Sequence, residues 1–368
     1  MNTTAIADFG RGVQRLIQGE DLSGEETYHM FKQVLENVQP DLQQGAFLAA
    51  LAAKGETVDE IVGAWKAIDE IDTIHTNGDL PSGLFDNSGT GMDKLKTFNV
   101  SSASAIVAAA CGVPMARHGA RALTSKCGTV DMLESVGVDV ECEVSVVENS
   151  IKEVGIGLFN GMSSNVHPGA LGRILSQIRF GSTLNIAASL ANPARPTLGL
   201  RGVYADSIMQ SVVEVMQKIG YKKGMVVYGI DSDSGLGMDE ISPCGETIIY
   251  EFSEDKVKNY SFVPENAGIK TFKFSEIAFS GSIKKESKKF LSVLSGNGHE
   301  ACVDFVSLNA GAILYVAGKC DSIKDGVQLS RDAIKSGMAM NKLRQWVSVQ
   351  SKRNTFGHKP LESLLKQE

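Results

Sequence analysis

The spacing of apolar residues along the chain changes near residue 80. Before this point apolar residues recur at helical spacing, and residues 23–26 and 57–60 each carry Ser or Thr at the first position and Glu at the fourth. A Ser/Thr-x-x-Glu sequence ahead of an apolar helical pattern is the form of a helix-capping box. Residues 77–83 then include Asn, Gly, Asp and Pro, which break helices. The pattern predicts a small helical unit at residues 1–76.

From Leu84 onward, short apolar or β-branched runs alternate with Ala-rich helical stretches. Runs at residues 112–115, 225–230 and 247–252 are typical of strands, and residues 102–110 are typical of a helix. Such alternation indicates an α/β fold. We therefore predict a large α/β domain with a central mixed sheet flanked by helices.

One later segment has the character of the first unit. Residues 171–188 are apolar and mostly helical until Asn192 and Pro193 end the pattern, so the chain can return to the helical unit there. This predicts two domains: a helical domain of residues 1–76 joined by about 171–195, and an α/β domain of residues 77–170 and 196–368.

Composition narrows the class of partner. The chain has 368 residues and a formal net charge of −7, which disfavours nucleic acid or an anionic membrane as the main partner. Six cysteines lie far apart with no Cys-x-x-Cys pair, so neither a zinc site nor a disulfide framework is indicated. There is no signal-peptide pattern and no stretch of about 18 uncharged apolar residues. We expect a cytoplasmic protein that acts on small molecules.

The densest chemical pattern is a glycine-rich loop at residues 89–93, followed by residues 97–102 at the start of an Ala-rich helix. Glycines allow close approach of the backbone to a phosphate, and hydroxyl and amide groups at a helix N-terminus attract an anion. The alternative is a tight turn without a ligand. The loop lacks the Lys-Ser ending of a P-loop, and Lys94 replaces the third glycine of a dinucleotide fingerprint.

Basic residues and hydroxyls follow at residues 117–121 and 124–129. Arg offers planar pairs of donors to phosphate oxygens, so this segment suits a polyanionic ligand. A solvated basic loop is the alternative.

The third pattern is the acidic pair Asp239 and Glu240, which follows the predicted strand at residues 225–230. Adjacent carboxylates suit Mg²⁺, which takes oxygen ligands and keeps waters that bridge to substrate phosphates. The alternative is an acidic surface turn. No nucleophile motif accompanies these patterns, and ribosyl transfer with a pyrophosphate leaving group requires none.

The motifs resemble, in order and approximate spacing, those of the anthranilate phosphoribosyltransferase family. The resemblance extends from about residue 10 to residue 350, and its motifs lie at residues 89–93, 97–101, 118–122, 167–168, 238–242 and 309–318. It implies a Mg²⁺-dependent homodimer in tryptophan biosynthesis that moves the phosphoribosyl group of phosphoribosyl pyrophosphate onto a small aromatic acceptor.

The resemblance also implies roles for particular residues. Donor contacts would be Gly89, Asp93, Thr97, Asn99, Ser101, Ser102, Arg117, Ser125 and Thr129. Metal ligands would be Ser101, Asp239 and Glu240. The residues facing the acceptor would be His118, Ala120, His167 and Gln177.

Departures from the family pattern concentrate on the acceptor side. Met92 replaces a loop glycine, Ala120 replaces an Asn that faces the acceptor, and Gln177 stands where the family has a carboxylate-binding Arg. The segment around Gln177 is also about two residues shorter, so Arg173 or Arg179 would supply the cation if the register shifted by one turn.

Several functions stay open at this point. Anthranilate is the default acceptor, and a paralogous transferase with a different aromatic acceptor is the main alternative. A nucleoside phosphorylase is weaker because of the Asp239–Glu240 pair, and a non-enzymatic relative that binds nucleic acid is disfavoured by the acidic charge.

Overall fold

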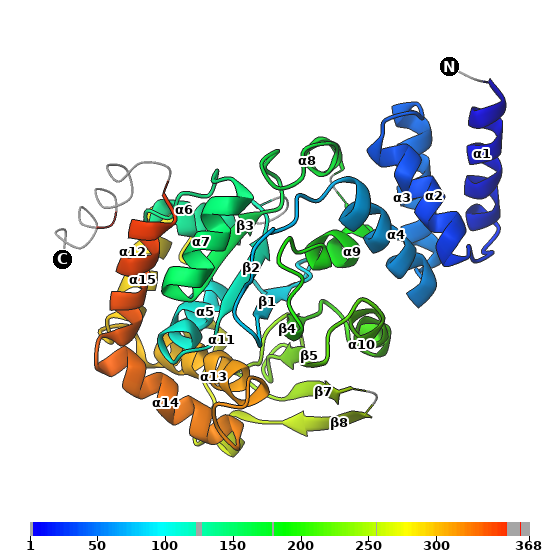
Figure 1. Ribbon diagram of the computed structural model, residues 1–368. Helices are drawn as coiled ribbons and strands as arrows, with labels where there is room; N and C mark the ends of the chain where they lie inside the picture. The colour runs from blue at the N-terminus through cyan, green and yellow to red at the C-terminus, as the bar shows by residue number, and fades with distance from the viewer. Residues whose placement is uncertain (1–2, 123–126, 179, 255, 352–360, 362–368) are drawn as a thin grey trace.

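The structure is a computed structural model that describes residues 3–122, 127–178, 180–254, 256–351 and 361. Four N-terminal helices lie together at one end of the molecule, on the right of Figure 1. They are α1 (Thr3–Ile17), α2 (Gly24–Leu35), α3 (Asp41–Lys54) and α4 (Val58–Ile71). Both predicted capping boxes are confirmed: Ser23 caps α2 with Glu26, and Thr57 caps α4 with Glu60.

Eight described strands form one mixed sheet with the order β3-β2-β1-β4-β5-β7-β8, and the short β6 pairs with β5. The first five in this order are parallel, whereas β6 and β7 run antiparallel to β5 and β8 runs antiparallel to β7. The strands are β1 (Phe85–Gly89), β2 (Met115–Gly119), β3 (Ile156–Asn160), β4 (Leu198–Gly202), β5 (Lys223–Ile230), β6 (Gly237–Met238), β7 (Thr247–Ser253) and β8 (Lys256–Phe262). The predicted fold class is confirmed.

Two of the three predicted strands fall inside observed ones, β5 and β7, and the third prediction was wrong. Residues 112–114 lead into β2 outside the strand, because Gly112 has a φ of +84° and Pro114 cannot donate to a sheet. The strand itself begins at Met115 and continues through Arg117 and His118, whose polar side chains hide it from an apolar pattern.

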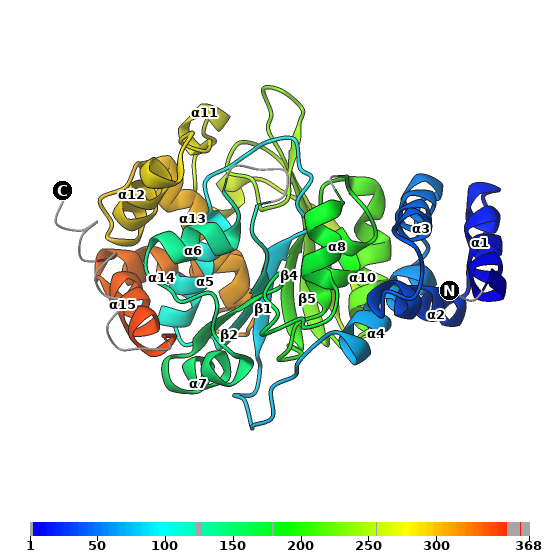
Figure 2. The same cartoon turned by 90° about the horizontal axis from the view of Figure 1, so that it is seen from above.

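Helices from the α/β domain cover one face of the sheet, on the left in Figures 1 and 2. They are α5 (Val100–Ala110), α6 (Thr129–Ser135), α11 (Phe274–Ile277), α12 (Ile283–Leu294), α13 (Glu300–Val316), α14 (Ile323–Lys335) and α15 (Met338–Val349). The helix α7 (Val144–Val154) packs on the other face at the β3 edge, against Ala116, Gly157 and Phe159. The short 3₁₀ helices are η1 (Asp206–Ile208) and η2 (Pro264–Ala267). In β5, Met225 and Val227 point into the core on this face, while Val226 points to the opposite face, as strand alternation requires.

The opposite face is shared between the sheet and the helical unit. Here α8 (Leu171–Gln177), α9 (Leu184–Leu190) and α10 (Met209–Lys218) join α1–α4 in one buried apolar cluster. The indole of Trp65 in α4 donates to the carbonyl of Leu190 at 3.1 Å. The segment predicted as mostly helical is therefore two short helices, of which α9 packs against α4, while the exact domain limits stay a prediction.

None of the helices in the described ranges combines the length and the apolar character needed to cross a membrane.

Candidate active site

A cavity of about 590 Å³ lies at the carboxyl ends of β1 and β2. The first turn of α5, the loop after β6, and the two short helices α8 and α9 close its walls. In sheets with parallel strands, ligands bind at this edge. Both the α/β domain and the α8–α9 segment thus contribute to a single site.

The glycine loop and Asp239 meet at van der Waals distance. The Gly91 N–H donates to Asp239 Oδ2 at 2.8 Å, and a Cβ at Gly89 would lie 1.9 Å from the same oxygen. On the other side, a Cβ at Gly202 would lie 1.5 Å from the Asp239 carbonyl oxygen. Only glycine fits at positions 89 and 202 while this carboxylate keeps its place.

The acidic pair concentrates negative charge in the cavity wall. Burial and the nearby Asp93 carboxylate raise the pKa of Asp239 to about 7, and burial with the neighbouring Asp239 carboxylate raises the pKa of Glu240 well above its usual range. Glu240 Oε1 accepts from the Thr97 hydroxyl at 3.4 Å, whereas its Oε2 is buried without a hydrogen-bond partner.

These carboxylates fit a divalent cation that keeps part of its water shell. Among the described residues, no group of three or more His, Cys, Asp or Glu side chains is arranged as a metal cage. Magnesium needs no such cage, because one or two carboxylates with waters and substrate phosphates complete its shell. A bound cation would satisfy the unpartnered oxygen of Glu240 and favour the ionised form of both carboxyl groups.

Asp93 faces the same cavity but is already paired. Its carboxylate accepts from Lys96 Nζ at 2.9 Å, and burial raises its pKa. The pair leaves the lysine charge beside the loop, where a phosphate could compete for it.

The start of α5 presents three predicted donor contacts to the cavity, Thr97, Asn99 and Ser101. Asn99 precedes the helix without capping it, and its buried Oδ1 has no hydrogen-bond partner. A helix of 11 residues begins here, so its free N–H groups and positive dipole end face the cavity.

Ser102 and Arg117 occupy different places from those implied by the resemblance. The Ser102 hydroxyl is fully buried behind the cavity wall and accepts from Arg117 at 2.6 Å. The rest of the Arg117 guanidinium, only 1% exposed, donates to the side chain and carbonyl of Asn87. Arg117 borders the cavity, and three of its five N–H groups tie β2 to β1 and α5, while its contact with a phosphate stays a prediction.

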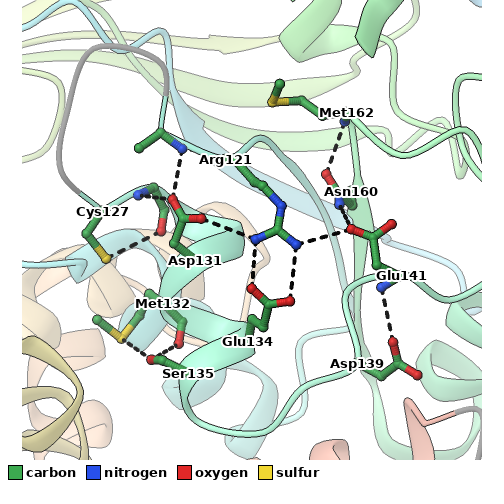
Figure 3. A network of polar contacts seen from close by, with 12 residues as sticks. Arg121, Cys127, Asp131, Met132, Glu134, Ser135, Asp139, Glu141, Asn160 and Met162 are labelled. Carbon is green, nitrogen blue, oxygen red and sulfur yellow. Dashed lines mark hydrogen bonds and ion pairs between the residues drawn. The ribbon is translucent and has the colours of Figure 1, made fainter. Parts of the chain in front are cut away.

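The second basic residue of this segment, Arg121, is also committed. Its guanidinium points into a fork of carboxylates, with bonds to Glu134 at 2.7 and 3.1 Å and to Glu141 and Asp131 at 3.2 and 3.3 Å (Figure 3). These carboxylates raise its pKa. The predicted basic loop is therefore largely neutralised, at least in its described part.

Two more residues were predicted to contact the phosphoribosyl donor, Thr129 and Ser125. Thr129, at the start of α6, lines the cavity. Ser125 lies outside the described residues.

On the acceptor side, His118 and Ala120 line the cavity and His167 stands behind His118. The two imidazoles meet at 3.0 Å between their Nε2 atoms. Burial and the neighbouring ring lower the pKa of His118 to about 3, and burial lowers that of His167. Both rings are thus neutral near pH 7.

The prediction for Gln177 does not agree with the geometry. Leu171 and Leu175 lie on one face of α8, and they line the cavity together with Ile178, which directly follows the helix. Gln177 points away from that face and is exposed. Arg173 turns to the helical domain, where it donates to Val34 and Gln44, and Arg179 lies outside the described residues.

The acceptor wall is mainly apolar, with Ser182, Asn185 and Ser189 as its polar members. Side chains from α8, α9 and the loop between them form its apolar part, namely Leu171, Leu175, Ile178, Phe180, Leu184 and Ala188. The sequence pattern marked this segment as helical but did not show which face turns to the site.

Met92 joins this wall to the glycine loop. It has a φ of +68°, which is unfavourable for a residue with a side chain, and a Cβ at Gly181 would lie 1.9 Å from its Cε. Nearby, Asn185 Nδ2 donates to the Thr90 carbonyl at 3.1 Å. Asn185, like Gly202 and Asn87, was missed from the sequence because no local motif marks it.

Comparison with known proteins first defines the class. Residues 82–340 match the family model for the α/β domain of a glycosyl transferase family, and residues 13–70 match that for its helical bundle domain. The chain is 36% identical over 341 residues to the anthranilate phosphoribosyltransferase of Desulfatibacillum aliphaticivorans, covering 92% of this chain and 98% of the relative. It is 30% identical over 345 residues to that of Methanothermobacter thermautotrophicus, covering 92% and 97%.

Solved structures agree with these matches. The anthranilate phosphoribosyltransferase of Thermus thermophilus superposes with a TM-score of 0.81 at 30% identity, covering 92% of this chain and 98% of that one. The Saccharomyces cerevisiae enzyme, in complex with phosphoribosyl pyrophosphate and Mg, shares the fold with a TM-score of 0.82 at 22% identity, covering 94% and 99%. The chain belongs to the anthranilate phosphoribosyltransferase family, and it is a glycosyltransferase enzyme, as the resemblance predicted.

Proposed function

We propose that this enzyme transfers the phosphoribosyl group of phosphoribosyl pyrophosphate to an aromatic acceptor, with Mg²⁺ at Asp239 and Glu240 and anthranilate as the default acceptor. Relatives that are at least 30% identical carry the name anthranilate phosphoribosyltransferase. The Saccharomyces cerevisiae relative binds phosphoribosyl pyrophosphate and Mg. A cytoplasmic homodimer that serves tryptophan biosynthesis belongs to the same proposal.

One observation carries the proposal: the unpaired carboxylate oxygen of Glu240 lies in the same cavity as a glycine loop and the start of α5. A pyrophosphate suits the loop and the helix start, and a cation between it and the carboxylates would balance the charge.

The residues of the chain would act by position and charge. Transfer breaks the bond from the anomeric carbon to a pyrophosphate oxygen, which keeps the electron pair, and forms a bond from that carbon to the nitrogen or oxygen of the acceptor, which releases its proton to solvent. Magnesium, when bound, supplies positive charge to the departing pyrophosphate. The start of α5 holds the phosphates, while the unpartnered Asn99 Oδ1 is an acceptor for a ribose hydroxyl.

The apolar wall would hold the ring of the acceptor. Leu171, Leu175 and Ile178 offer aliphatic surface in the same cavity as the glycine loop, and such a surface would orient the ring. Alignment of the two reactants in one cavity is the main contribution expected from this half.

Pyrophosphate release with the donor, Mg²⁺ and anthranilate tests the function, together with the loss of anthranilate fluorescence. Release that depends on all three components is the expected result. No release with any acceptor, combined with tight, salt-dependent DNA binding, would favour the nucleic-acid-binding alternative.

A second acceptor class is favoured by the geometry around Gln177. Neither Ala120 nor the exposed Gln177 can bind a carboxylate as the family pattern requires, and the α8 side of the described wall is apolar. Release with a phenol or an aromatic amine, but not with anthranilate, would select the paralogous transferase.

A further inference from the structure

Two buried histidines and a main-chain carbonyl form a chain of contacts behind the acceptor side of the cavity. His167 Nδ1 lies 2.7 Å from the carbonyl oxygen of Asp72, and His167 Nε2 lies 3.0 Å from His118 Nε2. Asp72 follows the last turn of α4, so the chain of contacts runs from the helical domain to β2. Each contact can hold only one hydrogen, so the position of the hydrogen on each ring can be deduced one contact at a time.

The surroundings of His167 Nδ1 decide its protonation. Besides the Asp72 carbonyl, it faces the Thr73 hydroxyl at 3.3 Å, and that hydroxyl already donates its hydrogen to the Ile68 carbonyl at 2.9 Å. Both neighbours of Nδ1 are therefore acceptors, so Nδ1 carries the hydrogen. A neutral imidazole has one N–H group, so His167 Nε2 is left as an acceptor.

The proton on His118 follows from this. Its Nε2 faces the bare Nε2 of His167, so it must donate, and its Nδ1 is then without hydrogen. Burial disfavours the charged form of either ring, so neither ring carries hydrogen on both nitrogens.

One contact argues for the opposite order. His118 Nδ1 lies 3.5 Å from the Ser189 carbonyl, which would favour a hydrogen on Nδ1. That order would place a bare His167 Nδ1 against the Asp72 carbonyl at 2.7 Å. The opposite order would gain one long, weak hydrogen bond but would create a short contact between two buried acceptors. The first order of hydrogens is therefore favoured.

The packing of His118 decides which of its nitrogens can meet a ligand. Nε2 is occupied by its contact with His167, and a Cβ at Gly161 would lie 2.8 Å from it. Nδ1 lies toward Ser189, which lines the cavity together with His118. Nδ1 is therefore the ring nitrogen of His118 whose lone pair is left for a ligand.

We propose that His167, held by the Asp72 carbonyl, is a positioning residue that fixes His118 with a bare Nδ1, and that this Nδ1 accepts a hydrogen bond from an N–H or O–H group of the acceptor. The inference rests on the proposed function for the identity of the acceptor as a substrate. It restricts that substrate to aromatic molecules with a hydrogen-bond donor on or next to the nucleophilic atom.

The test begins with the ligand-free enzyme. Two-bond ¹⁵N–¹H correlation spectra of protein labelled at histidine distinguish a protonated Nδ1 from a protonated Nε2, and His118→Asn and His167→Asn variants assign the signals. We expect His118 with hydrogen on Nε2 and His167 with hydrogen on Nδ1. Hydrogen on Nδ1 of His118 would overturn the inference whatever the enzyme transfers.

A pair of variants tests the consequence for transfer. In His167→Gln the amide oxygen can take the place of Nε2 and accept from His118, whereas the shorter His167→Asn cannot reach it. With wild-type turnover established, His167→Asn should lower kcat by about tenfold, the value of one hydrogen bond, with an unchanged KM for phosphoribosyl pyrophosphate.

His167→Gln should recover most of this loss, and its His118 should keep hydrogen on Nε2. Equal kcat values for the two variants would overturn the positioning role. Absence of turnover in the wild type would instead refute the proposed function, and the spectra distinguish the two failures.

Discussion

The two halves of the cavity are built on different principles. The donor half is made of main chain: Gly89 and Gly202 allow the backbone to close around Asp239, and no side chain longer than hydrogen fits there. The acceptor half is made of side chains on one face of α8, with a neutral imidazole beside them. Main-chain geometry tolerates almost no substitution, whereas an apolar wall can change shape with each residue. The donor site is thus the constrained part and the acceptor site the adaptable one.

The largest expected effect is the loss of charge in the donor half. Asp239→Asn with Glu240→Gln keeps size but removes the proposed metal ligands, and should lower kcat/KM by about 1,000-fold, as for loss of the main electrostatic contact to a transition state. Pyrophosphate release over a range of Mg²⁺ concentrations measures this. The thermal midpoint should not fall, because burial already disfavours ionisation of both carboxyl groups and the amides keep their size. Unchanged metal dependence would refute the assignment.

A single methyl group in the donor half should have the next largest effect. In Gly89→Ala the new Cβ would lie 1.9 Å from the Asp239 carboxylate, so this group must move, and we expect a loss of activity of about 100-fold. Gly45→Ala is the matched control, since a Cβ in that helix meets nothing within 4 Å and alanine favours helices. Full activity in Gly89→Ala would show that the close approach is unnecessary.

In the acceptor half, substitutions should give smaller effects that depend on the helix face. Leu175→Ala should raise the KM for the acceptor about fivefold, since it removes roughly 1 kcal/mol of apolar contact, and leave the KM for the donor unchanged. Gln177→Ala, on the exposed face of the same helix, should leave both within about twofold. Steady-state kinetics of the two variants decides between the observed face and the one expected from the family pattern.

Replacing Met92 by Gly should have the smallest effect. Glycine relieves the strain of a φ of +68°, about 1 kcal/mol, but makes the unfolded chain more flexible by a similar amount, so the thermal midpoint should change little. The lost contact with Gly181 should raise the KM for the acceptor by about twofold. A strong loss of donor affinity would instead make Met92 part of the donor half.

The difference between the halves also explains what the sequence could predict. Capping boxes and glycine loops depend on residues a few positions apart, so they were found at Ser23, Thr57 and Gly89. The direction of a side chain depends on the partners that the fold brings to it. Arg117 was expected to face a phosphate, but Asn87 and Ser102 hold it from behind the wall.

Residues without a local pattern were missed for the same reason. Gly202 is needed only because the loop after β6 crosses it, which no neighbouring residue reveals. Position 177 was predicted from alignment with a family whose segment is longer, and a difference of two residues rotates a helix by more than half a turn. The remaining donor and metal assignments stay predictions.

Asp72 links the acceptor half of the cavity to the end of α4. Its carboxylate accepts from the N–H groups of Ala170 and Leu171 at the start of α8, while its carbonyl accepts from His167. The wall and the inner histidine are therefore anchored to the end of the same helix, α4, whereas His118 belongs to the central sheet. Any hinge motion of the helical domain would stretch the contact between the two imidazoles, so the ring that meets the substrate would also sense domain closure.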